Sequence, residues 1–222
     1  MKEMTNLKDL LKHELEDLYS AEEQIIDGLP GMIEKAGNKE LKKSLSDHLK
    51  VTREQKSRLE KIKKLLGSQE NEEDRGFFAR LFSGGSHHCK AMEGLIKEGE
   101  KIMDQPMEPE VRDAAIIGAA QKIEHYEISG YGTAKAYAMQ LGLDEVVDLI
   151  DQTLEEEYEA DDLLTELAVT NVNLDAEQDS NEESEEEMDS LRKLPVKKNT
   201  PAKKRASRTT TARKKSGGSK KS

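Results

Sequence analysis

Apolar residues recur alternately three and four positions apart along four long segments of this chain, and that spacing limits the possible folds more than any other feature. Such a repeat forms an apolar stripe along one side of an α-helix, and the stripe must be buried against other helices. The four segments cover residues 6–36, 38–67, 109–141 and 144–169. The sequence therefore predicts an all-α protein built on a four-helix bundle.

The ends of these segments carry residues that commonly start and stop helices. Asn6 and Asn38 can cap the first two helices, and Gly37 and Gly142 follow the first and third. Connections of one or two residues make sequential helices antiparallel neighbours. The connection between the second and third helices is much longer, which favours a crossover with a short extra helix at 90–103.

Composition agrees with a long-helix protein and limits the cellular compartment. Charged residues make up 36% of the chain, aromatic residues make up 4%, and there is no Trp. The only cysteine is Cys89, so no internal disulfide can form and a reducing compartment is expected. Residues 1–10 lack the apolar region of a signal peptide, and no apolar run is long enough to cross a membrane. We therefore expect a cytoplasmic protein.

Polar residues interrupt the apolar stripes near the middle of every long helix. These residues are Glu22 on the first helix, His48, Thr52 and Gln55 on the second, Glu124, His125 and Glu127 on the third, and Glu157 and Asp161 on the fourth. Glu124 and Glu127 are three residues apart and share a helix face. His125 lies about 100° round the helix from Glu124 and can point into or away from the centre.

Several carboxylates at one level of a bundle would repel one another strongly. A buried carboxylate costs several kcal/mol unless it is paired, protonated or bound to a cation. A pair of divalent metal ions offsets this cost, because hard cations prefer oxygen ligands and iron also accepts imidazole. Glu and His side chains that project from four helices build the known di-iron and di-manganese bundles.

Each polar residue also has a simpler explanation. A single seam Glu can form a salt bridge or reach solvent, and a single seam His can be an ordinary hydrogen-bonded core residue. Together the polar groups can form a hydrogen-bonded network that fixes the register of the helices in a structural homodimer. A further group, His87, His88 and Cys89, lies in the crossover. Because adjacent residues rarely close one metal site, we assign it no metal role.

Charge is distributed very unevenly along the chain. The net charge is −11, yet residues 192–222 hold 13 of the 35 Lys and Arg residues and none of the 46 Asp and Glu residues. Residues 174–191 are strongly acidic. Neither segment has enough apolar surface to offset the entropy of ordering. We predict a helical bundle at 1–173, a disordered acidic linker at 174–191 and a disordered basic tail at 192–222.

The composition of the basic tail resembles that of histone-type tails. Lys and Arg at this density can neutralise phosphates and bind DNA without sequence preference, in a salt-dependent way. The candidate nucleic-acid contacts are Lys197, Lys198, Lys203, Lys204, Arg205, Arg208, Arg213, Lys214 and Lys215. The alternatives are a solubilising tail and a tail that folds back onto the acidic linker.

Three motifs resemble the YciE/YciF-type branch of the ferritin-like superfamily, which is related to rubrerythrin. They are LYSAEEQ at 18–24, KAMEGLI at 90–96 and AAQKIEHYEI at 119–128. The resemblance covers residues 6–172 and leaves out the tail. It implies a ferritin-like four-helix bundle with a short extra helix, a homodimer, a link to stress responses and a rubrerythrin-like di-metal centre.

The resemblance also implies a set of metal ligands. Carried over by position, they are Glu22, His48, Glu124 with Glu127 or His125, and Glu157 with Asp161. The chain departs from the wider superfamily in its Glu-x-x-His pairs. Leu45 stands three residues before His48, and Glu157 and Asp161 are four residues apart.

Two functional hypotheses follow. The first is a stress-related protein that binds iron or manganese in the bundle core and oxidises Fe(II) or consumes peroxide. The second is a non-enzymatic DNA-associated homodimer that is tethered by the basic tail. The two can coexist in one protein, and the sequence leaves open whether the chain is an enzyme.

Overall fold

The computed structural model describes residues 4–68 and 87–177 of the 222-residue chain. Within these ranges all regular secondary structure is helical. The elements are α1 (Leu7–Lys35), α2 (Lys39–Ser68), α4 (Lys90–Met103), α5 (Pro109–Gln140), α6 (Asp144–Leu167), the π-helical turn η1 (Ala168–Val172) and α7 (Asn173–Glu177). The four long helices, together with the short helix α4, confirm the predicted all-α class.

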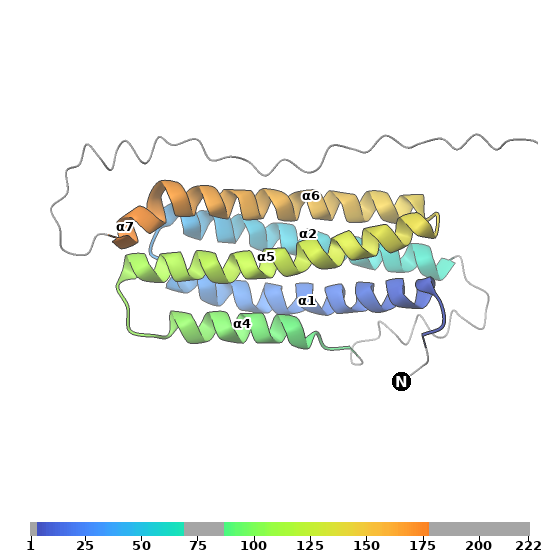
Figure 1. Ribbon diagram of the computed structural model, residues 1–222, viewed down its shortest axis with the longest axis horizontal. Coiled ribbons are helices and arrows are strands. Elements are labelled where there is room, and N and C mark those ends of the chain that lie inside the picture. Colours follow the sequence, from blue (N-terminus) through green and yellow to red (C-terminus); the bar gives the residue numbers. More distant parts are fainter. Residues whose placement is uncertain (1–3, 69–86, 178–222) are drawn as a thin grey trace, which may run out of the picture.

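The four long helices lie side by side with their axes roughly aligned (Figure 1). Helix α1 packs on α2 and α5, and α6 closes the bundle by packing on the same two helices. Helix α4 lies outside this bundle against α1 and α5. The arrangement is the predicted ferritin-like four-helix bundle with a short extra helix in the crossover.

The helix ends follow the capping rules that the sequence indicated. The Asn6 side chain accepts a hydrogen bond from the backbone N–H of Asp9 at 3.0 Å, and Asn38 caps α2 in the same way. Asp113 of α5 accepts hydrogen bonds from the backbone N–H groups of Gly37 and Asn38, each at 2.7 Å. The turn between α1 and α2 is therefore held directly against α5.

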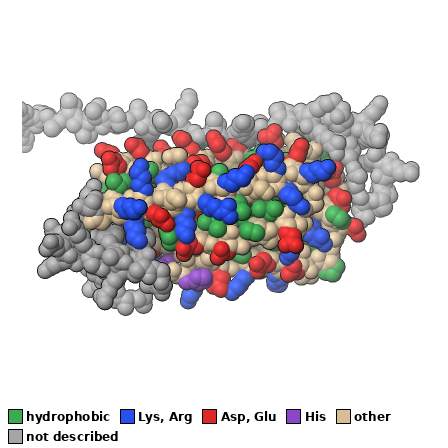
Figure 2. Space-filling view, turned by 180° about the vertical axis from the view of Figure 1, so that it is seen from behind, with side chains coloured by type: hydrophobic (Ala, Val, Ile, Leu, Met, Phe, Trp, Pro, Cys, Tyr) green, Lys and Arg blue, Asp and Glu red, His purple; other side chains and the backbone are tan. Residues whose placement is uncertain are grey.

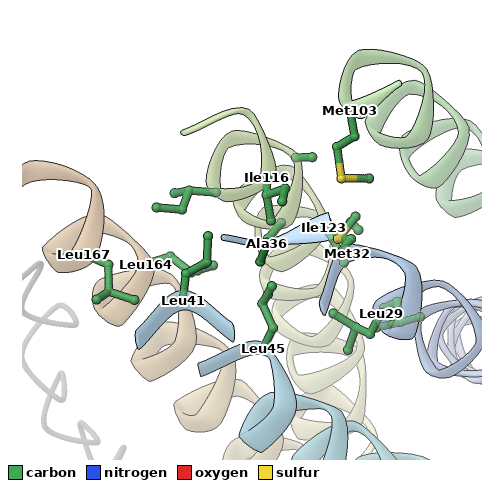
Figure 3. Packing of buried hydrophobic residues seen from close by; sticks show 14 of the residues in the cluster. Leu29, Met32, Ala36, Leu41, Leu45, Met103, Ile116, Ile123, Leu164 and Leu167 are labelled. Atoms are coloured by element: carbon green, nitrogen blue, oxygen red, sulfur yellow. The ribbon is translucent and has the colours of Figure 1, made fainter. Parts of the chain in front are cut away.

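The apolar interior is divided into two clusters by the level of polar residues. Figure 3 shows one cluster, in which side chains from α1, α2, α4, α5 and α6 point toward one another. It includes Leu29, Met32, Leu41, Leu45, Met103, Ile116, Ile123 and Leu164. The second cluster lies at the other end of the bundle and includes Leu11, Leu15, Leu59, Ile62, Tyr131, Ala134 and Ile150. On α1, α2, α5 and α6, the predicted polar positions fall between these two clusters.

The last helical segment extends beyond the predicted end of the bundle. The chain remains helical through η1 and α7 as far as Glu177, so residues 174–177 are helical where we expected the linker to begin. Val172 is buried and belongs to the first apolar cluster, which explains why the chain stays packed on the bundle here. The predicted disorder of residues 178–191 and of the basic tail falls outside the described residues.

Within the described ranges, no helix has an apolar stretch of the length needed to span a membrane.

Candidate metal centre

Five titratable side chains from four helices meet between the two apolar clusters. They are Glu22 of α1, His48 of α2, Glu124 and Glu127 of α5, and Glu157 of α6, and we call them the carboxylate cluster. All four carboxylates are buried, with exposed fractions of 0–3%. One donor atom from each of His48, Glu124, Glu127 and Glu157 lies within 4.8 Å of the others. Glu22 is close enough to interact electrostatically with Glu157.

Helix geometry explains why these side chains meet. Glu22 and Glu157 occupy seam positions between apolar residues, so the packing that buries their neighbours also buries them. Glu124 and Glu127 are one helical turn apart and both face the interior. The structure thus brings together five of the seven metal candidates predicted from the sequence.

The other two candidates, His125 and Asp161, are paired with each other beside the cluster, where Asp161 is still close enough to interact electrostatically with Glu124. The His125 side chain is 68% exposed, and its Nε2 lies 3.1 Å from an Asp161 carboxylate oxygen. The second oxygen of Asp161 accepts a hydrogen bond from Gln121 at 3.0 Å. His125 lies about 100° round the helix from Glu124, on the side that faces solvent, so it is not placed to be a ligand of this centre.

Hydrogen bonds hold two of the carboxylates in place. The Tyr131 hydroxyl donates to Oε1 of Glu22, and the Gln55 amide donates to Oε1 of Glu157. Tyr131 is fully buried in the second apolar cluster, so its hydroxyl has a fixed position. Neither contact involves Oε2, so the second oxygen of Glu22 and of Glu157 remains available to another partner.

Most of the remaining polar atoms in the cluster lack a hydrogen-bond partner among the described residues. Five buried carboxylate oxygens have none: Oε2 of Glu22, Oε2 of Glu124, Oε1 and Oε2 of Glu127, and Oε2 of Glu157. Nε2 of His48 also makes no hydrogen bond, although it lies 3.4 Å from Oε1 of Glu124. Buried polar atoms are nearly always satisfied in native proteins, so this concentration needs an explanation.

Burial dominates the acid–base behaviour of the cluster. Burial, followed by the charge of Glu157, raises the pKa values of Glu22, Glu124 and Glu127 well above the usual value for Glu. Burial likewise raises the pKa of Glu157 to about 7, and it lowers the pKa of His48 to about 4. Without a cation, the carboxylates therefore tend to hold protons and the imidazole is neutral.

A charged network borders the cluster on the side of α2 and α6. Arg58 donates two hydrogen bonds to Glu156, each at 2.9 Å, and a third to Thr153. Gln55 donates to Glu156 at 3.2 Å as well as to Glu157. The positive charge of Arg58 moderates the rise in the pKa of Glu157. Sequence reasoning missed the roles of Arg58 and Tyr131, because no local pattern shows which residue on another helix each one contacts.

A surface groove between α2 and α6 reaches the cluster at His48. Its volume is about 400 Å³, and its lining residues include Asp47, His48, Val51, Glu159, Ala160 and Leu163. The His48 side chain is 10% exposed, whereas the four carboxylates are almost completely enclosed. His48 therefore stands between the groove and the carboxylates.

The donor set of the cluster matches a pair of hard or borderline divalent cations. Four carboxylates and one imidazole provide the oxygen-rich, nitrogen-poor environment that suits iron and manganese. The five unpartnered oxygens supply lone pairs that cations could accept in place of protein hydrogen bonds. The residues present therefore fit the di-metal centre that the resemblance implied.

Residues 6–177 match a family described as a domain of unknown function (DUF892). The chain belongs to this family. Protein YciF of Escherichia coli strain K12 is 40% identical over 174 residues, which cover 78% of this chain and 97% of that protein. The recognition of a YciF-type protein from its motifs is therefore confirmed.

Solved structures of similar proteins agree with the DUF892 assignment. The crystal structure of the E. coli stress protein YciF matches with a TM-score of 0.66 and 38% identity, covering 77% of this chain and 99% of that one. YcfI from Rhodopseudomonas palustris matches with a TM-score of 0.65 and 38% identity, covering 74% and 96% respectively. The DUF892 match ends with α7 and does not include the acidic and basic segments beyond it.

The predicted nucleic-acid contacts between Lys197 and Lys215 lie outside the described residues. On the face of the bundle seen in Figure 2, Lys and Arg side chains are interspersed with Asp and Glu rather than gathered into one patch. The described residues visible on that face therefore form no concentrated positive patch for a phosphate backbone.

Proposed function

We propose that the DUF892 domain of this chain binds two iron or manganese ions in the carboxylate cluster and acts as a stress-related metal protein. The observation that carries the proposal is the set of five buried carboxylate oxygens without hydrogen-bond partners, contributed by three of the four long helices. Leaving such atoms both unpaired and ionised would cost several kcal/mol. Cations that accept these lone pairs would remove that cost.

The same observation argues against a purely structural network. A polar network that fixes helix register must satisfy its members, because a partly satisfied network is less stable than an apolar core. Neither oxygen of Glu127 accepts a hydrogen bond within the described part of the chain. The geometry therefore favours a cation-binding site over a hydrogen-bonded network whose members are all satisfied.

The individual residues would have distinct roles around the ions. Glu124, Glu127 and Glu157 would supply oxygen ligands, and His48 would supply the nitrogen ligand on the side of the groove. Tyr131 would hold Glu22 so that its free oxygen faces the centre, and Gln55 would do the same for Glu157. A bound di-metal centre supplies electron transfer to peroxide or O₂, which these side chains cannot perform themselves.

The residues also provide for proton movement and access. Carboxylates with raised pKa values release protons when cations bind, so loading of the site is coupled to proton release. Glu157, with a pKa of about 7, is suited to hold or give up a proton near neutral pH. The groove at His48 would bring ions and small oxidants to the edge of the cluster, and a change in the His48 side chain would open the remaining way to the carboxylates.

Metal analysis of the full chain tests the proposal. After anaerobic reconstitution with Fe(II) or Mn(II), elemental analysis should find about two ions per chain. Glu127→Gln removes a ligand charge with little change in shape and should lower the stoichiometry and slow peroxide-dependent Fe(II) oxidation. Glu155→Gln is the matched control, because Glu155 is exposed on α6. Binding below about half an ion per chain, with no difference between the two variants, would refute the proposal.

A second proposal concerns the basic segment 192–222, and the observation that favours it is its composition of 13 Lys and Arg residues without an acidic residue. It would hold the protein on DNA through phosphate contacts. Gel shifts of the full chain should weaken steeply with salt, and a chain that ends at Asp189 should not bind. Persistent binding by the truncated chain would contradict this role.

Self-association also remains a proposal. We propose that the bundle forms a homodimer in the cytoplasm, as the resemblance implied, and light scattering of the full chain and of the chain that ends at Asp189 would test it. A monomeric mass for both chains would contradict it.

A further inference from the structure

A second group of metal-ligating side chains lies where α1 faces the segment that leads into α4. His13 and Glu16 come from α1, and His87 comes from the residues just before α4. One donor atom of each lies within 4.8 Å of the other two. All three are partly buried. None of them belongs to the carboxylate cluster, and the proposed function gives them no role.

Hydrogen bonds from α1 fix the position of the segment that carries His87. The backbone N–H of Cys89 donates to the Ser20 hydroxyl at 3.0 Å, and the Gln24 side chain donates to the Cys89 carbonyl at 3.0 Å. The rings of His13 and His87 meet edge to face, with centroids 5.0 Å apart. The two imidazoles are therefore brought together by the fold.

Asp17 orients the His87 ring. The Nε2 atom of His87 lies 2.7 Å from an Asp17 carboxylate oxygen. The other oxygen of Asp17 accepts hydrogen bonds from the Tyr126 hydroxyl and the Cys89 thiol, which hold this carboxylate in place behind the ring. The contact through Nε2 leaves Nδ1 as the ring nitrogen available to a cation. A carboxylate behind a histidine is the usual support for a metal-ligating imidazole.

Glu16 provides the third donor. Its Oε1 atom is buried and has no hydrogen-bond partner among the described residues. An unpartnered carboxylate oxygen thus stands beside two imidazoles, as it would in a site built for a cation.

We propose that His13, Glu16 and His87 bind one divalent transition-metal ion, with zinc as the best-suited representative. Two imidazoles and one carboxylate form a common three-residue ligand set for zinc, with water completing the coordination. The ion would clamp the segment before α4 onto α1. This site is richer in nitrogen than the carboxylate cluster, so it should prefer zinc over manganese.

The neighbouring candidates in the sequence do not join this site. His88 is largely exposed and is paired with Glu93 at 3.1 Å. The Cys89 thiol contacts Asp17 and Tyr126 instead of the imidazoles. His87 therefore acts with residues far away in the sequence, and the adjacent pair His88 and Cys89 does not contribute.

Zinc titration of the full, untagged chain by calorimetry tests the proposal. His13→Ala and His87→Ala should each remove one zinc ion per chain from the stoichiometry, or weaken that step by at least about tenfold. His88→Ala is the matched control and should leave the step unchanged. The difference between variants isolates this site whether or not the carboxylate cluster also binds zinc.

Crystals of the unaltered chain grown with zinc provide an independent measurement. Anomalous scattering at the zinc edge should place an ion between the two imidazoles and Glu16. An absent peak at this position would overturn the proposal, as would equal zinc binding by His13→Ala and His88→Ala. Circular dichroism would show whether a variant has failed to fold, and the crystal result would then decide.

Discussion

The carboxylate cluster and the site at His13 differ in how the fold builds them. The first draws on α1, α2, α5 and α6, lies in the dry interior and contains four carboxylates and one imidazole. The second draws on one helix and one connecting segment, is partly exposed, and contains two imidazoles and one carboxylate. The carboxylate cluster forms when the four long helices pack and bury their seam residues. The His13 site forms at the surface, where residue 87 lies against α1.

An unpartnered carboxylate oxygen destabilises the fold far more in the carboxylate cluster than at the His13 site, because the cluster is more deeply buried. The charges of the carboxylate cluster are removed from water, and most of their oxygens lack protein partners. Glu16 has one such oxygen but keeps part of its side chain exposed. Without metal, the interior cluster should therefore reduce the stability of the bundle, and the surface site should have little effect on it.

Replacement of the carboxylate whose two oxygens both lack a hydrogen-bond partner among the described residues should give the largest effect. Glu127→Leu exchanges an unpartnered buried carboxylate for an apolar side chain of similar size. We expect it to stabilise the metal-free protein by about 1–4 kcal/mol and to abolish iron loading. Urea unfolding of the metal-free protein measures the first change, and elemental analysis measures the second.

The same substitution at the His13 site is the comparison for Glu127→Leu. Glu16→Leu should change the stability of the metal-free protein by no more than about 0.5 kcal/mol. If Glu127→Leu instead lowered stability, the cluster would be satisfied in the metal-free state and the difference between the two regions would disappear.

Loss of the Tyr131 hydroxyl should have the next largest effect. Tyr131→Phe leaves Oε1 of Glu22 buried without its donor, which should cost about 1–3 kcal/mol of stability. It should also weaken metal binding, because Glu22 would lose its orientation. Tyr137→Phe is the control, since Tyr137 is also on α5 but packs against the second apolar cluster and not against the carboxylates. Equal effects of the two changes would mean that the Tyr131 contact has no special role.

The pH dependence of stability should follow the carboxylates. Burial raises the pKa of Glu157 to about 7, so its contribution to the stability of the metal-free protein is full below pH 4.5 and is lost as the pH rises through 7. His48 acts in the opposite sense: its contribution is full above pH 6.5 and is lost as the pH falls through about 4. The Tm of the metal-free protein should therefore fall between pH 5 and pH 7.5, by about 2–4 °C for each kcal/mol lost.

Glu157→Gln should reduce this fall in Tm, whereas Glu155→Gln should leave it unchanged because Glu155 is exposed on α6. A Tm that rises across the same pH range would show that the carboxylates are ionised and already stabilised without metal.

The smallest expected effect concerns the support behind His87. Asp17→Asn should weaken zinc binding at the His13 site by about tenfold, because the neutral amide orients the ring less firmly. Calorimetric titration with zinc checks this. Asp27→Asn is the control, since Asp27 is exposed on the same helix. Binding of manganese to the carboxylate cluster should be unchanged in both variants.

Sequence periodicity could predict the bundle and most of the interior cluster. Glu22, Glu124 and Glu157 occupy positions where helical spacing alone requires burial, and the structure buries all three. The orientation of His125 could not be decided in this way, because it lies at the edge of the buried face. The three motifs predicted the YciF-type family, and the family match across residues 6–177 confirmed that prediction.

Contacts between distant segments were beyond the reach of the sequence. The hydrogen bond from Tyr131 to Glu22 depends on the spacing of α1 and α5, and no local pattern marks it. The approach of His87 to His13 depends on how residues 87–89 pack against α1. In both cases the sequence shows a residue that can form the contact, but only the packing of the helices shows its partner.

The position of Cys89 has a consequence for chemistry under oxidative stress. Its thiol is buried beside Tyr126 and Asp17, and burial raises the pKa of the thiol above the usual value. Oxidants and disulfides react with the thiolate, which is scarce under these conditions. Because the thiol is buried and mostly protonated, oxidation of Cys89 and its pairing with another chain should be slow. If the proposed function holds, the electrons that reduce peroxide would come from Fe(II) held by the carboxylate cluster and not from Cys89.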